Sequence, residues 1–343
     1  MTQNKTQCPR CYSTNLYKFG KDKHGHQKYQ CQECKRQFAP KTLENRKPKE
    51  RKYPSCPKCG KATFLHHSYK HYNQLRCWDK ECNHSFSVPK PTSIKNPSCE
   101  NVKGKTNFKG MKYPMHTILL ALYLYYLNQS STRAISRLLK DMYNIDVSHV
   151  TIANWSKKFA PIFQEKSNRL RPKTLCQSDE WHTDETVVKI NGQKYYLWAI
   201  IDSETRFVLN FHLSPYRNSD QAFRLFKDAK EKFGQPRSIV SDRYFSYNVP
   251  CKIIFSNSEH IKVQSFKDDI SNNLIESFFG TFKDWVKRRR GFNSFSSANQ
   301  LITTFIFFYN YVRRHSELND HTPAQVAGIE YSDDQRKSWL LAS

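Results

Sequence analysis

The segment Asp184-Glu-Thr-Val-Val-Lys-Ile190-Asn-Gly-Gln193-Lys-Tyr-Tyr-Leu-Trp-Ala-Ile-Ile-Asp202 predicts two antiparallel β-strands joined by a tight turn. Both halves are rich in β-branched and aromatic residues, which favour extended chain. The Asn191-Gly192 pair between them is typical of a two-residue hairpin turn, because both central residues of that turn need positive φ. A β-hairpin with acidic residues near its two ends is therefore the first element that the sequence predicts.

The elements after this hairpin follow the order of a mixed α/β domain. We expect a third strand at Phe207–Leu213, an amphipathic helix at Ser219–Lys232 that ends near Gly234, and a fourth strand at Arg237–Ser241. A short fifth strand at Ile261–Ser265 and further helices complete the series. This is the element order of an RNase-H-like α/β domain, in which two Asp residues on strands and a Glu on a helix meet at one point.

Three carboxylates are candidates for such a meeting point. Asp184 lies in the first strand, Asp242 directly follows the fourth, and Glu276 lies in a helix opened by Asn272-Asn273. Lys283 follows Glu276 by seven residues, or two helical turns, and so returns to nearly the same face. The apolar residues of this helix share a different face: Ile275, Phe279, Phe282 and Val286.

Four other carboxylates near these positions have simpler interpretations. Asp179, Glu180 and Asp202 are expected to be strand-end or surface charges. Glu185 is adjacent to Asp184, and neighbouring strand residues point to opposite faces, so Glu185 is expected to point away from a site built on Asp184. None of the four is therefore expected to bind a metal ion.

Residues 113–172, before the α/β core, have a helical pattern. Apolar residues recur at three- and four-residue steps from Pro114, a second helix is expected from Ser131 or Thr132 to about Tyr143, and a third from Ser148 to Phe159. Two short helices with a short connection predict a helix-turn-helix, and a plain helical bundle is the alternative. In a helix-turn-helix, the last helix presents polar and cationic groups to DNA: His149, Thr151, Asn154, Lys157 and Lys158.

Eight cysteines in residues 1–112 form two similar units, each with a Cys-Pro-(Arg/Lys)-Cys knuckle and a second cysteine pair further along. This spacing is typical of zinc ribbons, in which four thiolates bind one Zn²⁺ and leave no position open for a catalytic water. Redox cysteines or chance knuckles are the alternative. We expect two structural Zn²⁺ ions, the first bound by Cys8, Cys11, Cys31 and Cys34, and the second by Cys56, Cys59, Cys77 and Cys82.

A strong positive charge indicates a polyanionic partner. The 343 residues contain 56 Lys and Arg against 30 Asp and Glu, which gives a formal net charge of +26. Residues 1–112 alone hold 25 Lys and Arg against 7 Asp and Glu. A composition that is 38% hydrophobic excludes a merely disordered basic chain. The longest apolar runs are too short for a membrane span, so the expected partner is nucleic acid and not a membrane.

These features together resemble the DDE transposases of small bacterial and archaeal insertion sequences. The specific likeness is to the compact group with a helix-turn-helix directly before the catalytic core and replicative, cointegrate-forming transposition. The resemblance covers roughly residues 113–300 and rests on Trp181-His-Thr-Asp184-Glu-Thr, Lys189-Ile-Asn-Gly192-Gln-Lys-Tyr-Tyr-Leu-Trp198-Ala-Ile-Ile-Asp202, Leu213-Ser-Pro215, Ser241-Asp242, Asn272-Asn-Leu-Ile-Glu276 with Lys283, and Arg288-Arg-Arg-Gly291-Phe292-Asn-Ser-Phe295.

Two features depart from that compact group. The closing Phe308-Tyr-Asn310-Tyr-Val-Arg313-Arg-His315 and Thr322-Pro-Ala324 resemble the tail of integrase-type DDE proteins more generally. Two tandem ribbons are also more than members of the compact group usually carry. The resemblance is therefore to the DDE insertion-sequence transposases as a class, with a different N-terminal region.

The resemblance implies that Asp184, Asp242 and Glu276 form a catalytic triad that binds two Mg²⁺ or Mn²⁺ ions per active site. Hard cations prefer carboxylate oxygens, and such a site hydrolyses DNA at the transposon end and then uses the freed 3′-hydroxyl to attack target DNA. Lys283 is expected to bind phosphate beside the metals. Four consecutive cations after the catalytic helix predict a phosphate track, with a solvated face as the alternative: Lys287, Arg288, Arg289 and Arg290.

The sequence therefore predicts an α/β protein with an RNase-H-like catalytic core preceded by an all-α helix-turn-helix module and two small zinc ribbons. The expected domains are ribbon 1 at residues 1–45, ribbon 2 with a basic linker at 46–112, the helix-turn-helix at 113–172, the DDE domain at 173–330 and a C-terminal tail at 331–343.

The expected function is Mg-dependent strand cleavage and 3′-hydroxyl strand transfer at insertion-sequence terminal repeats. The expected partners are the double-stranded DNA of the transposon ends and of the target, bound by a homodimer or larger synaptic assembly. The expected location is the cytoplasm, at the nucleoid of a prokaryote. A catalytically silent DNA-binding regulator and a nuclease without strand transfer are the alternatives.

Overall fold

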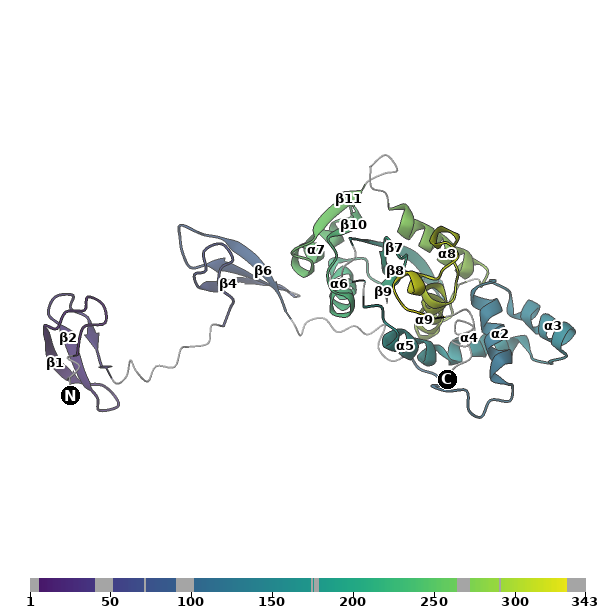
Figure 1. The fold of residues 1–343 in the computed structure, drawn as a ribbon, viewed down its shortest axis with the longest axis horizontal. Helices are drawn as coiled ribbons and strands as arrows, with labels where there is room; N and C mark the ends of the chain where they lie inside the picture. Colours follow the sequence, from purple (N-terminus) through teal and green to yellow (C-terminus); the bar gives the residue numbers. More distant parts are fainter. Residues whose placement is uncertain are drawn as a thin grey trace. The chain divides into compact units, whose positions relative to one another are not determined.

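The computed structural model describes residues 6–40, 52–70, 72–90, 102–173, 175, 179–263, 272–289 and 291–331. It divides into two compact units, the first comprising Met1–Phe64 and Arg76–His84, the second Leu65–Leu75 and Ser85–Ser343. Figure 1 shows the order of helices and strands along the chain. The finer domain boundaries expected from the sequence stay predictions.

Each four-cysteine segment forms a small three-stranded sheet with its strands in chain order. The first sheet contains β1 (Leu16–Lys21), β2 (Gln27–Cys31) and β3 (Gln37–Phe38). The second contains β4 (Thr63–Ser68), β5 (Tyr72–Cys77) and β6 (Ser85–Pro89). The buried apolar cluster of the first ribbon consists of Cys8, Cys31 and Phe38, which is too small a core to hold a fold by itself. The repeat in the sequence thus corresponds to a repeated structure.

Among the described residues, four helices precede the α/β core: α2 (Met115–Tyr126), α3 (Thr132–Tyr143), α4 (His149–Lys158) and α5 (Ala160–Arg169). Ser131 and Ser148 are the N-caps of α3 and α4, and each side chain accepts a hydrogen bond from a backbone N–H of the first turn. Asn144 adopts a left-handed conformation with φ of 51° and ends α3. The tight connection between α3 and α4 fits a helix-turn-helix.

A five-stranded mixed sheet forms the centre of the α/β core, in the order β11-β10-β7-β8-β9. The strands are β7 (Glu180–Ile190), β8 (Gln193–Asp202), β9 (Val208–Ser214), β10 (Ser238–Asp242) and β11 (Glu259–Val263). β7, β8 and β9 are antiparallel neighbours, whereas β10 runs parallel to both β7 and β11. Asn191 and Gly192 have φ of 48° and 77° and form the turn predicted between β7 and β8. This is the RNase-H-like topology that the sequence predicted.

Helices pack on both faces of this sheet (Figure 1). One face carries α6 (Ser219–Phe233), the 3₁₀-helix η2 (Phe245–Tyr247) and α7 (Asn248–Ile254). The other carries α8 (Asn273–Lys287) and α9 (Phe295–Tyr311), which η3 (Ser316–Leu318) and α10 (Pro323–Val326) follow. The parts of β7 and β8 away from the turn are therefore covered by helices, whereas Val187, Lys189, Gln193 and Lys194 near the turn are exposed.

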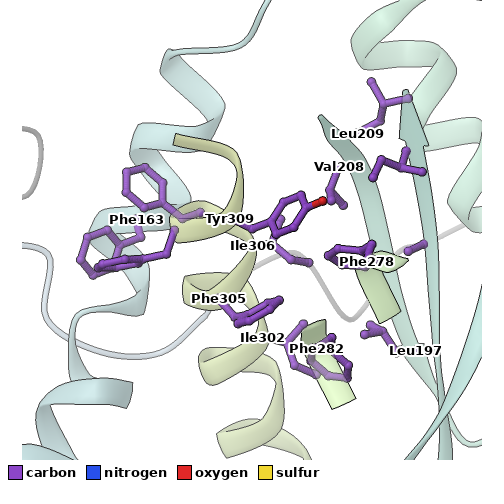
Figure 2. Close-up of a cluster of buried hydrophobic side chains, with 14 of the residues drawn as sticks. Phe163, Leu197, Val208, Leu209, Phe278, Phe282, Ile302, Phe305, Ile306 and Tyr309 are labelled. Carbon is purple, nitrogen blue, oxygen red and sulfur yellow. The ribbon is translucent and has the colours of Figure 1, made fainter. Parts of the chain in front are cut away.

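The core under α8 and α9 is largely aromatic (Figure 2). Phe278 and Phe282 of α8 lie with ring centroids 6.4 and 5.4 Å from that of Phe305 on α9. The side-chain amide of Asn310 pairs with both the N–H and the carbonyl oxygen of Val208, each at 2.9 Å, and so joins α9 to the edge strand β9. Among the described residues, no helix is both long and apolar enough to cross a bilayer.

Three details of the core differ from the sequence predictions. The helix α7 between β10 and β11 was not predicted, and the fifth strand begins at Glu259 instead of Ile261, while residues 264–271 lie outside the described residues. Asp202 ends β8 as expected, but it is fully buried. Its Oδ2 accepts hydrogen bonds from the N–H and the hydroxyl of Thr205, at 2.9 and 2.6 Å. Asp202 therefore stabilises the turn after β8 and is not a surface charge.

Candidate active site and metal centres

Three carboxylates meet where β10 ends. The parallel pairing of β10 with β7 sets Val240 beside His182, so two further residues along each strand bring Asp242 to the level of Asp184. The carboxylate oxygens of Asp184, Glu185 and Asp242 lie within 4.8 Å of one another. Two of the three predicted triad members are thus neighbours because parallel strands carry them to the same edge of the sheet.

Glu276 approaches this acidic cluster from α8. His182 lies with Nδ1 3.2 Å from Oδ1 of Asn272, the N-cap of α8, and this buried contact fastens the first turn of the helix to β7. The Glu276 side chain is exposed, and its charge acts on Asp184. Among the described residues, the acidic group within 4.8 Å does not include Glu276. Glu276 thus lies outside the group of three carboxylates and is close enough for its charge to act on Asp184.

Burial of a carboxylate among like charges dominates the electrostatics of this site. Burial, followed by the charges of Glu185, Asp242 and Glu276, raises the pKa of Asp184 to about 7. A divalent cation between these oxygens would offset the repulsion, and carboxylate oxygens are the donors that Mg²⁺ and Mn²⁺ prefer. The residues present therefore fit a divalent metal site.

Glu185 lies in this site, and the expectation that it points away was wrong. The strand alternates as expected, because Asp184 pairs with Ala199 and Glu185 with Trp198 across the hairpin. The longer Glu side chain nevertheless brings its carboxylate within 4.8 Å of Asp184 and Asp242. Strand alternation fixes the face of the sheet on which a side chain leaves the backbone. The length and conformation of the glutamate side chain then decide where its carboxylate lies.

Three further residues hold the acidic cluster, and the sequence analysis did not identify them. The side chain of Glu185 is only 1% exposed and accepts hydrogen bonds from the Tyr247 hydroxyl and from Nε of Arg217. Burial raises the pKa of Glu185, and these two donors oppose the rise. The backbone N–H of Tyr244 donates to Oδ1 of Asp242 at 3.0 Å. The only sequence signal for Arg217 was its position just after the Leu213-Ser-Pro215 motif.

Each ribbon gathers its four cysteine sulfurs within 4.8 Å of one another. In the first ribbon, the Sγ atoms lie 3.4 Å apart for Cys8 and Cys34 and 3.5 Å apart for Cys11 and Cys31. In the second, the distances are 3.9 Å for Cys56 and Cys82 and 3.4 Å for Cys59 and Cys77. A tetrahedral Zn²⁺ with bonds of 2.3 Å to sulfur has sulfur–sulfur edges of about 3.8 Å. Both clusters therefore fit a four-thiolate zinc site.

Equivalent knuckles favour the thiolate form in the two ribbons. Burial opposes ionisation of Cys8, but backbone N–H groups of Cys11 and Arg10 lower the pKa of its thiol to about 6. In the same way, burial is outweighed at Cys56 by N–H groups of its own knuckle, which lower the pKa to about 7. The thiolate is the form that binds zinc, so the first cysteine of each knuckle is prepared for the metal, whereas burial and the neighbouring sulfurs raise the pKa of Cys11 and Cys77 to about 12.

The residues predicted to contact DNA are mostly accessible. On α4, Asn154 and Lys158 are exposed, while His149, Thr151 and Lys157 are half-buried. On α8, Lys283 and Lys287 are exposed, as is Arg288 directly after the helix. A groove of about 700 Å³ lies between the helical module and the core, and its lining includes Lys157 and Arg288.

Arg289 differs from the predicted phosphate track. Its guanidinium carbon lies 3.9 Å from the ring centroid of Tyr125 and 4.2 Å from that of Trp285, and its terminal amino groups donate to the carbonyl oxygens of both residues. These contacts join the end of α8 to α2, so Arg289 is engaged inside the protein. Arg290 lies outside the described residues.

Comparisons with known proteins agree with this geometry. A family model described as a DDE domain matches residues 178–315, and one described as the InsA N-terminal domain matches residues 1–35. The transposase for the insertion sequence-like element IS431mec from Staphylococcus aureus is 26% identical over 228 residues, which cover 65% of this chain and 96% of that protein. The transposase for IS257 in transposon Tn4003 from the same species matches with the same identity and coverage.

The solved structures to which this chain is similar include the catalytic core domain of HTLV-2 integrase in complex with magnesium. It is 16% identical, with a TM-score of 0.35, and the match covers 45% of this chain and 99% of that one. The DDE domain match spans the strands and the helix that carry Asp184, Asp242 and Glu276. The comparisons support an insertion-sequence transposase of the DDE type, which is a polynucleotidyl transferase.

Proposed function

We propose that this transposase cuts DNA at the ends of its own insertion sequence and joins the freed 3′-hydroxyl to target DNA, in reactions that depend on Mg²⁺ or Mn²⁺. The observation that carries the proposal is the cluster of Asp184, Glu185 and Asp242 oxygens within 4.8 Å, next to Glu276. Burial together with the charges of neighbouring carboxylates raises the pKa of Asp184 to about 7, which is typical of a functional site and is the environment that a divalent cation would neutralise.

In this proposal, Asp184, Asp242 and Glu276 hold two metal ions. When bound, the ions supply positive charge to the attacking and leaving oxygens of phosphodiester exchange and lower the pKa of the nucleophile. The chain's own residues orient the donors, because the Tyr244 N–H holds the Asp242 carboxylate and Asn272 fastens the first turn of α8 to β7. The two Zn²⁺ ions of the ribbons are structural, since four thiolates leave no open position.

The ribbons and the helix-turn-helix recognise the terminal repeats in this proposal. Support comes from the charge of +26, from the polar face of α4 and from the basic groove at the junction with the core. The residues assigned to DNA are His149, Thr151, Asn154, Lys157 and Lys158 of α4 together with Lys283, Lys287 and Arg288. Two transposon ends must be joined to one target, so the active form is a homodimer or larger assembly at the nucleoid of a prokaryotic cell.

The test incubates purified protein and Mg²⁺ with labelled DNA that carries the parent element's ends and with a supercoiled target, beside an Asp242→Asn variant. We expect end-specific nicks and joined products from the wild type alone. Cut ends without joined products would instead indicate a nuclease. Tight end binding with uncut DNA in both Mg²⁺ and Mn²⁺ would indicate a regulator.

A further inference from the structure

We propose that Arg217 forms a binding subsite for a DNA phosphate beside the acidic cluster, and that Glu185 and Tyr244 are the residues that position it. The inference rests on the proposed function and extends it to a residue that no motif assigned. A phosphodiester that approaches Asp184 and Asp242 meets carboxylates of its own sign, so a fixed cation next to them lowers the barrier to its entry. Arg217 lies between β9 and α6 and is the arginine in direct contact with that cluster.

Contacts on several sides fix the Arg217 guanidinium. Its Nε donates to Glu185, and its central carbon lies 3.9 Å from the ring centroid of Tyr244, in a cation–π contact. The Tyr244 hydroxyl donates to the carbonyl oxygen of Arg217 at 3.0 Å, and the Tyr244 N–H donates to Asp242 at 3.0 Å. A ring of contacts thus joins Arg217 to two of the three clustered carboxylates.

The guanidinium keeps donors for a ligand. An arginine has five N–H donors, and Nε carries one of them. In the portion of the chain that the structure describes, the terminal amino groups of Arg217 make no hydrogen bond, and the side chain is 40% exposed. Those amino groups form the planar fork that matches two phosphate oxygens. The site is therefore open on the side that a phosphate would approach.

Glu185 serves Arg217 in this arrangement and not a metal ion. One oxygen of its carboxylate accepts from Arg217 and the other from the hydroxyl of Tyr247, which is completely buried. With both oxygens engaged and the side chain 1% exposed, the carboxylate is already committed to two donors. The cluster thus divides into Asp184 and Asp242, which face a cation, and Glu185, which orients an arginine.

The test measures binding of a DNA duplex carrying the parent element's end, in EDTA, as a function of NaCl concentration. The proteins are the wild type, Arg217→Ala, Arg217→Lys and the control Arg237→Ala. Arg237 forms an exposed ion pair with Asp179 at 3.6 Å, at the opposite end of β10, so its loss removes the same charge away from the site.

We expect Arg217→Ala to weaken binding about tenfold and to reduce the slope of log affinity against log salt by about 0.9, the value for one lost phosphate contact. Arg217→Lys keeps the slope and loses part of the affinity, because a lysine lacks the fork. The proposed subsite would be overturned if Arg217→Ala bound DNA with the wild-type affinity and salt slope. It would also be overturned if Arg237→Ala changed the affinity and the slope as much as Arg217→Ala does. EDTA prevents cleavage, so this binding experiment does not depend on catalysis. A wild-type protein that fails to transfer strands in the Mg²⁺ assay would refute the proposed function and leave the binding result unaffected.

A second measurement separates positioning from metal binding by Glu185. Glu185→Gln removes a negative charge, which by electrostatics alone strengthens DNA binding. If Glu185 orients Arg217, binding weakens instead. Calorimetric titration with Mn²⁺ is expected to show that Glu185→Gln retains most of the affinity that Asp242→Asn loses. Stronger DNA binding, or an equal loss of Mn²⁺ affinity in both variants, would contradict the positioning role.

Discussion

Asn310 offers a quantitative test of how α9 holds the edge of the catalytic sheet. Its buried side-chain amide pairs with the N–H and the carbonyl oxygen of Val208, each at 2.9 Å. Asn310→Ala leaves a backbone donor and a backbone acceptor without partners in the interior. Each lost hydrogen bond costs about 1 to 1.5 kcal/mol, so the two together predict a loss of about 2 to 3 kcal/mol in the free energy of unfolding. For a core of this size, that loss lowers Tm by about 4 to 12 °C.

Urea unfolding followed by tryptophan fluorescence measures this loss, because Trp181, Trp198 and Trp285 are all completely buried. The matched control is Asn299→Ala on the same helix. Asn299 is also buried, but its side-chain oxygen has no hydrogen-bond partner among the described residues. The control is expected to lose clearly less stability than Asn310→Ala. Equal losses in the two variants would refute the reasoning that the paired amide stabilises β9.

Three other predictions concern zinc, pH and Arg289. Chelation of zinc is expected to unfold both ribbons and leave the α/β core folded, as followed by NMR, and two equivalents of Zn²⁺ per chain restore them. Burial lowers the pKa of His212 from 6.5 to about 4 although its ring is bonded to Gln221, so the unfolded chain binds a proton that the folded chain does not. The contribution of His212 to the free energy of unfolding is therefore complete above pH 6.5 and falls by about 3 kcal/mol as the pH drops towards 4. In denaturant titrations, His212→Gln should lack that part of the loss. Arg289→Met is expected to lower Tm without a change in the salt slope of DNA binding, whereas Arg288→Ala is expected to reduce that slope by about 0.9 and keep Tm.

The sequence predicted the elements whose signals are local. The Asn191-Gly192 turn and the N-caps Ser131 and Ser148 depend on residues a few positions apart and appear where they were expected. The stripe of α8 is confirmed at Ile275, Phe279 and Phe282, whereas Val286 is half-buried and Phe278 and Trp285 are buried as well. The cysteine units were equally predictable, because the spacing of metal-binding cysteines can be read directly from the sequence.

The features that the sequence did not predict depend on contacts across the fold. Strand alternation excluded Glu185 from the predicted site, yet hydrogen-bond donors on η2 and on the loop after β9 hold its carboxylate there. Arg289 was counted with its basic neighbours, although an aromatic pair and two carbonyl oxygens engage it. Asp202 was expected to be a strand-end or surface charge; it does end β8, but burial and the hydroxyl of Thr205 give it a structural role. No pattern within a single element encodes these partners.

The measurement that tests the central claim most directly is metal rescue of strand transfer. Asp242→Cys replaces a hard oxygen donor with a soft sulfur, which Mg²⁺ accepts poorly and Mn²⁺ accepts better. We predict that this variant forms no joined product in Mg²⁺ and recovers part of the wild-type yield in Mn²⁺, while Asp242→Ala stays inactive in both. Joined product at the wild-type level from Asp242→Cys or Asp242→Ala in Mg²⁺ would contradict a metal-binding catalytic role for the carboxylate at the end of β10.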